Sequence, residues 1–232
     1  MQYPGLALRL EQVRERIAEH QGRAGWSHPV TVIGVTKTHP PEAVLAAVSA
    51  GLRAVGENRV QEALAKQAAL PELSVEWHLI GTLQRNKARL AVNRFALIHS
   101  LDSVELAREL DRRAAPQSRQ PVLVQVNCSG EPQKGGVEPA ELEPLLNAVT
   151  DLPRLEVRGL MTMAEFTDEA RVQRESFRRL RELRDAARRP GLDHEPVSSQ
   201  GGRCGTGIAS DLPLLPTAGL ATRPCSTERG RH

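Results

Sequence analysis

Residues 30–44 read VTVIGVTKTHPPEAV. The first six positions form an apolar, mostly β-branched run, which is the composition of a parallel strand covered on both faces. Two prolines follow shortly afterwards, and proline favours the first turn of a helix. We therefore expect a buried strand over residues 31–37 and a helix over residues 40–51. Lys37 then stands at the end of a buried strand, and this position needs a physical reason.

The same order of apolar run and amphipathic segment occurs five more times along the chain. Units of this length, roughly 25–35 residues each, are typical of parallel strands joined by crossover helices. The expected strands span residues 31–37, 52–57, 75–81, 95–101, 122–127 and 155–163. The expected helices span residues 40–51, 58–70, 83–93, 102–115, 138–152 and 168–189, and residues 6–20 predict a further helix before the first strand.

Two architectures fit six such units. Two more units would close an eight-stranded barrel. An open doubly wound sheet usually brings a glycine-rich first turn, and the stretch GVTKTHPP lacks the G-x-G-x-x-G spacing. We therefore predict an α/β fold, a single (β/α)8 TIM-type barrel with an N-terminal helix, whose last one or two strands have no clear pattern. The predicted domains are a barrel over residues 1–195 and an aberrant C-terminal tail over residues 196–232.

Composition and charge exclude several classes of function. The chain has 232 residues, a net charge of +3 and three cysteines without metal-ligand spacing, so we expect no metal site. Its Arg-rich helix also carries Glu and Asp, as a solvated face does, and no zinc-finger spacing or aromatic RNA-binding box is present. The N-terminus lacks a signal-peptide pattern, and no apolar run approaches the ~18 residues of a membrane span. We expect a soluble cytoplasmic protein that binds neither nucleic acid nor a membrane.

A set of mostly polar side chains gathers where the expected strands end, which is the face that carries the active site in such barrels. In chain order they are Lys37, Thr38, Gly56, Glu57, Asn58, His78, Gly81, Gln84, Ser100, Asp102, Asn127, Met161 and Thr162. A lysine between apolar walls is partly desolvated, and desolvation disfavours the ammonium form. A neutral amine can attack an aldehyde and form a Schiff base. Lys37 is therefore a candidate for holding a carbonyl compound.

Each of these residues also fits a purely structural role. A strand-end lysine often reaches into water along its aliphatic stem. Asn58 can cap the helix that follows it, and His78 can be a hydrogen-bonded histidine of the core. Lys134 lies in the glycine-rich stretch GEPQKGGV and is expected to face solvent.

Six motifs taken together are far more specific than any one residue. In order along about residues 5–190 they are VTKTHP, GENRVQEA, WHLIGTLQRNKAR, HSLD, VQVNCSGEPQKGG and RGLMTM. This set resembles the pyridoxal phosphate homeostasis protein family, a single-domain barrel related to the N-terminal domain of alanine racemase. The resemblance implies a pyridoxal 5′-phosphate cofactor that is held as a reversible Schiff base on Lys37. It also implies a carrier without catalytic residues, which buffers intracellular pyridoxal phosphate and delivers it to dependent apo-enzymes. We expect a monomer.

The motifs and their places at strand ends also indicate the cofactor-binding residues. They are Lys37, Asn58, His78, Gly81 and Thr162 in the barrel, with Gly207 and Ser210 in the tail. The family usually carries a Leu-Ser-Met-Gly-Met-Ser-x-Asp segment that helps to hold the phosphate, and residues 207–212, GIASDL, echo it only faintly. A shifted reading frame, a diverged phosphate-binding segment and a disordered end on an incomplete barrel remain open as explanations of the tail.

Two other functions remain as alternatives. The first is a pyridoxal phosphate-dependent enzyme that resembles an amino-acid racemase. Two-base racemisation needs a second acid or base on the opposite face of the cofactor. Alanine racemases take a tyrosine from a separate domain, whereas this chain has one tyrosine, Tyr3, which is poorly placed at its N-terminus. The second alternative is a module that binds protein or nucleic acid, suggested only by a pI of about 9.0 and the Arg-rich helix.

Overall fold

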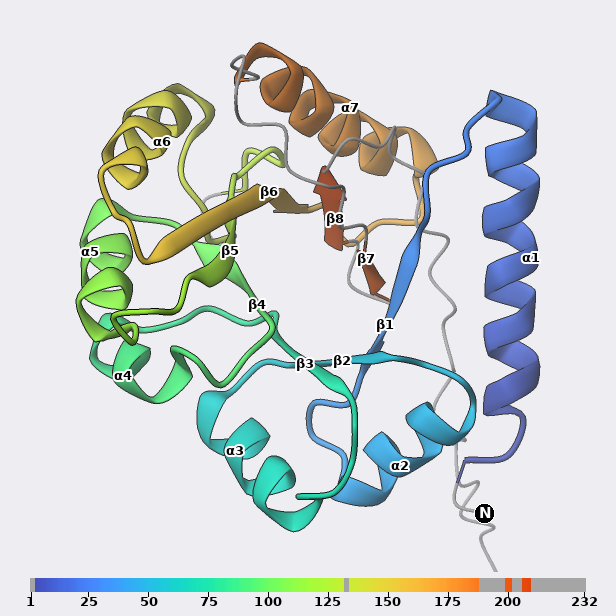
Figure 1. Ribbon diagram of the computed structural model, residues 1–232. Helices are drawn as coiled ribbons and strands as arrows, with labels where there is room; N and C mark the ends of the chain where they lie inside the picture. The colour runs from blue at the N-terminus through green and yellow to red at the C-terminus, as the bar shows by residue number, and fades with distance from the viewer. Residues whose placement is uncertain (1–2, 132–133, 188–198, 202–205, 210–232) are drawn as a thin grey trace, which may run out of the picture.

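The computed structural model describes residues 3–131, 134–187, 199–201 and 206–209. Strands form a ring with helices packed around its outside (Figure 1). The strands are β1 Thr31–Val35, β2 Ala54–Glu57, β3 Glu76–Leu79, β4 Leu97–Leu101, β5 Gln120–Gln125, β6 Leu155–Met163, β7 Ser199–Gly201 and β8 Thr206–Ala209. The α-helices are α1 Leu6–Ala24, α2 Pro41–Ser49, α3 Val60–Ala69, α4 Ala88–Ala91, α5 Val104–Arg113, α6 Leu142–Thr150 and α7 Ala170–Ala187, and the 3-10 helices are η1 Arg85–Lys87 and η2 Pro139–Glu141. Among these described helices, none has the length and apolar character required to cross a membrane.

The strands close into a barrel in the order β1-β2-β3-β4-β5-β6-β8-β7. The first six are parallel to their neighbours in chain order. The prediction of an α/β barrel with an N-terminal helix is confirmed. β7 is parallel to β1, but β8 is antiparallel to both β6 and β7. The closing pair departs from an all-parallel barrel because β8 begins soon after β7 ends, whereas parallel neighbours need a crossover of about a dozen residues.

The predicted tail contributes this closing pair, since residues 199–201 form β7 and residues 206–209 form β8. The remaining residues after 187 lie outside the described part of the chain. The predicted domain division at residue 195 therefore stays a prediction.

All six predicted strand–helix units are present, with one helix shorter than expected. We predict one helix over residues 83–93, whereas the structure has η1 followed by the single turn α4. Asn93 has a left-handed φ of 59°, a conformation that stops a right-handed helix and that asparagine tolerates better than most residues. Gln120 Oε1 accepts a hydrogen bond from the Asn93 amide at 2.8 Å and so fixes this turn.

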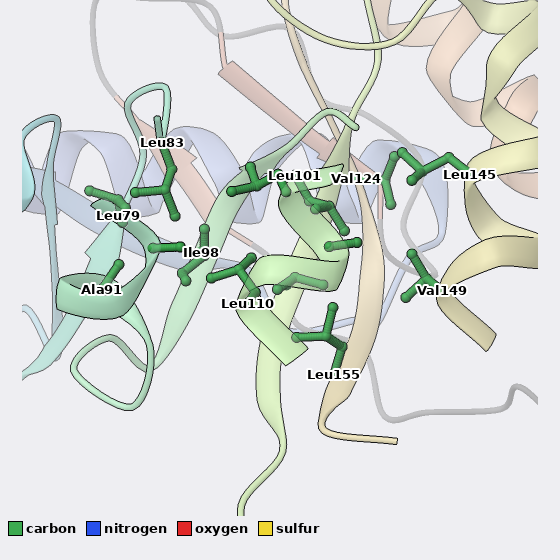
Figure 2. Packing of buried hydrophobic residues seen from close by; sticks show 14 of the residues in the cluster. Leu79, Leu83, Ala91, Ile98, Leu101, Leu110, Val124, Leu145, Val149 and Leu155 are labelled. Carbon is green, nitrogen blue, oxygen red and sulfur yellow. The ribbon is translucent and has the colours of Figure 1, made fainter. Parts of the chain in front are cut away.

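Apolar packing holds the helices against the outer face of the ring. The main cluster lies between strands β3 to β6 and the helices that cover them (Figure 2). A smaller cluster joins α1 and α2 to β2. Leu97, Leu123 and Met161 form a third cluster, and they alternate along β4, β5 and β6 with members of the main cluster. They therefore project into the ring, and the strands are apolar on both faces, as their sequences predict.

Leu110 of α5 is fully buried in the main cluster, so Leu110→Ala removes packed atoms and leaves a cavity. We expect its free energy of unfolding to fall by about 2–5 kcal/mol. Leu8 of α1 is 65% exposed, and Leu8→Ala is expected to change the free energy of unfolding by less than about 0.5 kcal/mol. Urea unfolding of both variants measures the two changes, and equal losses would contradict the packing described.

Candidate functional site

Two glycines show which side chains face the interior of the barrel. A Cβ built on Gly56 of β2 would lie 3.3 Å from Ile33 Cγ2 and 3.1 Å from Ile80 Cδ1, so these three residues share one face. A Cβ on Gly34 of β1 would instead lie 2.8 Å from Leu52 Cδ1, on the side that α2 covers. Side chains alternate along a strand. Residue 33 and every second residue after it therefore face the interior, and the residues between them face the helices.

Lys37 lies two residues beyond the end of β1. The alternation that starts at Ile33 puts it on the interior side of the ring. Its side chain is partly buried, and its Nζ makes no hydrogen bond or ion pair with any residue that the structure describes. The next residue, Thr38, has a left-handed φ of 63°. The structure thus places an amine that has no partner among the described residues just beyond the carboxyl end of a parallel strand.

A buried ion pair lies on the opposite side of the same strand end. Lys66 of α3 is only 4% exposed. Its Nζ donates to Thr36 O at 2.7 Å, to Glu57 Oε1 at 2.7 Å and to Glu62 Oε1 at 2.9 Å. Thr36 Oγ1 also donates to Glu57 Oε1 at 2.6 Å, and Thr38 N donates to Glu62 Oε1 at 2.6 Å. Both residues that flank the candidate amine are thereby bonded to this group.

We call Lys66, Glu57, Glu62 and Thr36 the Lys66 network. The hydrogen bond from Lys66 lowers the pKa of Glu62, and the Thr38 amide lowers it further, whereas partial burial opposes both. Glu57 is fully buried, and its Oε2 has no hydrogen-bond partner among the described residues. The network therefore joins the carboxyl groups of Glu57 and Glu62 to the amine of Lys66 on the outer side of the barrel, next to the end of β1.

Sequence reasoning missed this network. Glu62 and Lys66 are four residues apart on a helix, which is the spacing of an ordinary surface pair. Glu57 stands at a strand end as expected, but its carboxyl group contacts α3 on the outer side of the ring. The scarcity of lysine, four against 27 arginines, was the one available signal that Lys66 has a special place.

His78 lies inside the barrel, next to Gly56 in the register of β2 and β3. Its Nδ1 is 2.9 Å from His99 Nε2. Burial lowers the pKa of both imidazoles; the neighbouring His78 lowers that of His99 further, whereas the Glu76 carboxylate opposes the change at His78. Both rings are therefore neutral near pH 7, and one donates to the other. His78 has the hydrogen-bonded core role that the sequence allowed, and its contact with a cofactor stays a prediction.

Of the outer nitrogens of this histidine pair, His78 Nε2 lies 3.6 Å from Glu76 Oε2, and His99 Nδ1 has no hydrogen-bond partner within the described part of the chain. Because each neutral ring carries one hydrogen, the two outer nitrogens together comprise one N–H donor and one acceptor. His99 was missed from the sequence, although its alternation with buried apolar residues on β4 was the signal that could have found it.

Gly81 lets two strand ends approach each other closely. A Cβ on Gly81 would lie 2.7 Å from Asn58 Cα, so a larger residue would have to displace the turn after β2. Ser100 Oγ donates to Gly81 O at 2.8 Å from the next strand end. Asn58 is partly buried, and the alternation along β2 puts it on the interior side with Gly56. The structure thus brings Asn58 and Gly81 together, and their contact with a cofactor stays a prediction.

Two of the three remaining predicted site residues, Thr162 and Gly207, lie in the closing part of the ring. Thr162 is buried, and its Oγ1 donates to Val126 O at 2.7 Å and accepts from Cys128 N at 3.4 Å. Its hydroxyl therefore ties β6 to the end of β5. Gly207 lies opposite Thr162 in the antiparallel register of β6 and β8. Ser210 lies outside the described residues. A phosphate contact from any of them stays a prediction.

The expectation that Lys134 faces solvent is wrong. Its side chain is 18% exposed, and its Nζ pairs with Glu131 Oε2 at 2.7 Å. The same atom donates to Ala164 O at 2.6 Å, in the loop after β6. Asn127 Nδ2 donates to Glu131 O at 3.1 Å. The loop after β5 is thus held to the strand ends, because glycine-rich composition does not prevent a loop from being anchored by its polar side chains.

The carboxyl end of the barrel therefore combines an amine that no described residue binds with a mostly uncharged interior. Apolar side chains and a neutral histidine pair line the strands below Lys37. Among the described residues, no group of three His, Cys, Asp or Glu side chains could hold a metal ion. This arrangement can bind a small carbonyl compound through the amine, because a primary amine condenses reversibly with an aldehyde.

The chain matches a known family and its curated members. The family described as "Alanine racemase, N-terminal domain" matches residues 8–206. The pyridoxal phosphate homeostasis protein of Aquifex aeolicus is 44% identical over 183 residues, which are 78% of this chain and 80% of that protein.

Two solved structures of PipY from Synechococcus elongatus PCC7942 share the fold. The structure without PLP has a TM-score of 0.70 at 35% identity, and the match covers 85% of this chain and 97% of that chain. The structure with PLP bound has a TM-score of 0.63 at 39% identity, and the match covers 74% of this chain and 80% of that chain. The likeness therefore extends over most of both chains.

Gly81→Ala tests the close approach at Asn58. We expect the free energy of unfolding to fall by about 1–3 kcal/mol, because the added methyl group forces the backbone apart. The matched control is Gly22→Ala in α1, where a Cβ would meet nothing within 4 Å. Alanine favours a helix over glycine, so this control should be stabilised by up to about 1 kcal/mol. Urea unfolding gives the sign of the change in the free energy of unfolding for both variants. A more stable Gly81→Ala would contradict the close approach of Gly81 to Asn58.

The histidine pair predicts a pH dependence of stability. Below about pH 6.5 the imidazoles of the unfolded chain take up protons, whereas the buried pair resists them. The free energy of unfolding should therefore fall between pH 7 and 5, by at most about 1.4 kcal/mol per pH unit for each ring. His78→Leu/His99→Leu should remove this part of the slope, and His39→Gln, at an exposed position, should keep it. Urea unfolding at several pH values measures the slope, and an unchanged slope in the double variant would refute the assignment.

Proposed function

The chain belongs to the pyridoxal phosphate homeostasis protein family, and we propose that it holds pyridoxal 5′-phosphate as a reversible Schiff base on Lys37. The observation that carries this proposal is the Lys37 amine. It stands at the carboxyl end of β1, on the interior side, without a partner among the described residues. Lys66 and Lys134, in contrast, have their amines bonded to acceptors of the protein.

The surroundings of Lys37 suit this cofactor. Pyridoxal phosphate supplies an aldehyde that condenses with a primary amine and releases one water. Ile33 and Ile80 offer apolar contact on the interior face, and the neutral histidine pair adds no charge there. The PipY structure that has PLP bound supports the same cofactor for this chain, since the two are 39% identical.

The other contacts follow from the positions around Lys37. We assign Asn58, His78 and Gly81 to the cofactor side of the barrel, because they lie on the interior face or at the neighbouring strand ends. Thr162, Gly207 and Ser210 are the residues proposed to hold the phosphate end. Backbone N–H groups and small hydroxyl side chains are the donors that phosphates usually find in proteins.

The proposed role is that of a carrier rather than an enzyme. The relatives are named as homeostasis proteins, and this supports a function in which the cofactor is stored and passed on. We propose that the recipients are pyridoxal phosphate-dependent apo-enzymes and that the carrier is a cytoplasmic monomer. We also propose a division between barrel and C-terminal tail near residue 195, with β7 and β8 of the tail completing the ring of strands.

One contact favours a racemase-like enzyme as the second candidate. The ring of Tyr3 packs edge-on against His39, with ring centroids 6.1 Å apart. His39 follows Lys37 by two residues, so the one tyrosine of the chain lies beside the loop that carries the candidate amine. A phenol near the cofactor is the kind of second acid or base that racemisation needs.

Lysine-specific labelling tests the carrier proposal. Pyridoxal phosphate is added to the full chain, the absorbance band of the adduct is recorded, and borohydride reduction fixes the cofactor for peptide mapping. We expect the label on Lys37 alone of the four lysines, and loss of the band in Lys37→Ala. Lys87→Ala in η1 is the control that should keep the band. The same band in Lys37→Ala, or a label on another lysine, would contradict the assignment.

Racemisation assays separate the two candidate functions. With alanine and other amino acids as substrates, the carrier proposal predicts no rate above that of free pyridoxal phosphate. A faster rate that is lost in Tyr3→Phe would establish the enzyme instead.

A further inference from the structure

We propose that Lys66 is a positioning residue for Lys37. Through Glu57, Glu62 and Thr36 it fixes the backbone on both sides of Lys37 and so aims that amine into the barrel. This inference rests on the proposed function, because it says how the chain holds the cofactor-binding amine in place.

The amine of Lys66 is fully used by the protein. An ammonium group has three N–H donors. They reach three acceptors, namely Thr36 O, Glu57 Oε1 and Glu62 Oε1, at 2.7, 2.7 and 2.9 Å. The residue is also buried, with 4% of its surface exposed. Lys66 is therefore rigid, and it does not offer a second free amine to an aldehyde.

Lys66 is connected to both peptide bonds of Lys37, to one directly and to the other through Glu62. Thr36 O is the carbonyl of the bond that joins Thr36 to Lys37, and Lys66 holds it directly. Thr38 N is the amide of the bond that joins Lys37 to Thr38, and Glu62 holds it at 2.6 Å while bonding to Lys66. One buried ammonium thus connects the two ends of a three-residue segment.

The backbone of that segment needs such support. Thr38 is β-branched and has a left-handed φ of 63°. This conformation is rare for a β-branched residue and costs free energy, so it persists only where surrounding contacts enforce it. The contact that Glu62 makes with the Thr38 amide is of this kind. The strained turn is therefore a second observation, independent of the ion pair, that the position of residue 37 is imposed.

The network can be removed without leaving a buried charge unpaired. Lys66→Met alone would strand two carboxyl groups, and a fall in stability would then obscure any effect on binding. The double variant Lys66→Met/Glu57→Leu replaces the fully buried pair by apolar side chains of similar size, a change that proteins often tolerate. Thr36 O keeps a second donor in this variant, His39 N at 3.2 Å.

The test compares pyridoxal phosphate binding by the full-length wild type, the double variant, Glu62→Ala and Glu62→Gln. Urea unfolding first establishes that each variant is folded. Absorbance titration and stopped-flow mixing then give the apparent dissociation constant and the association rate. We expect the double variant and Glu62→Ala to bind on the order of tenfold or more weakly and more slowly, because a misplaced reacting group is costly. Glu62→Gln keeps an oxygen acceptor for Thr38 N and should bind more tightly than Glu62→Ala.

Lys87→Met is the matched control, because Lys87 lies in η1 outside the Lys66 network. It should bind as the wild type does. Folded variants that lack the network and still bind with the affinity and rate of the wild type would overturn the inference.

Hydrogen exchange of the Thr38 amide, measured without cofactor, tests the positioning role of Lys66 separately from the proposed function. The Thr38 amide should be protected in the wild type and should exchange faster in Glu62→Ala, whether or not Lys37 binds pyridoxal phosphate. Failure of the wild type to label on Lys37 would end the proposed function, whereas equal exchange at Thr38 in both proteins would end the positioning role alone.

Discussion

Successive residues of a strand project to opposite faces, and at the end of β1 this constraint separates Thr36 from Lys37. Thr36 lies on the side of the strand that α3 covers. Its hydroxyl group donates to Glu57 of β2, and its carbonyl oxygen accepts from Lys66 of α3. By the same alternation we infer that Lys37 lies on the interior side, where it has no partner among the described residues. The candidate site depends on this division. It puts the ion pairs of Lys66 on the outer side of the strand and the amine of Lys37 on the inner side.

The contrast between Lys66 and Lys37 shows how one residue type can serve two purposes. Lys66 has all its donors bonded inside the protein, so its position is fixed and its amine is occupied. Lys37 gains its position from the backbone that Lys66 and Glu62 hold, so its own amine stays available. A carrier of a reactive aldehyde needs both properties, since the amine must be well placed and yet unbonded.

The fold was predictable where the sequence pattern is strong. Six apolar runs such as VTVIGV and VLVQV alternate with amphipathic segments, and this pattern predicts parallel strands that are buried on both faces. The direction of β8 was not predictable, because a four-residue strand carries no periodic signal and is set by its partners. The strand pattern also predicted Lys37 close to a strand end, although β1 ends two residues before it. The contacts of Glu62, Lys66 and His99 did not, because they depend on which residues the ring brings together across the chain.

A crystal structure of the chain grown with pyridoxal phosphate tests the central claim most directly. The account predicts electron density that is continuous from Lys37 Nζ to the aldehyde carbon of the cofactor, with Lys66 Nζ still bonded to Thr36 O. Cofactor linked to a different lysine, or bound without a link while Lys37 points to solvent, would contradict it.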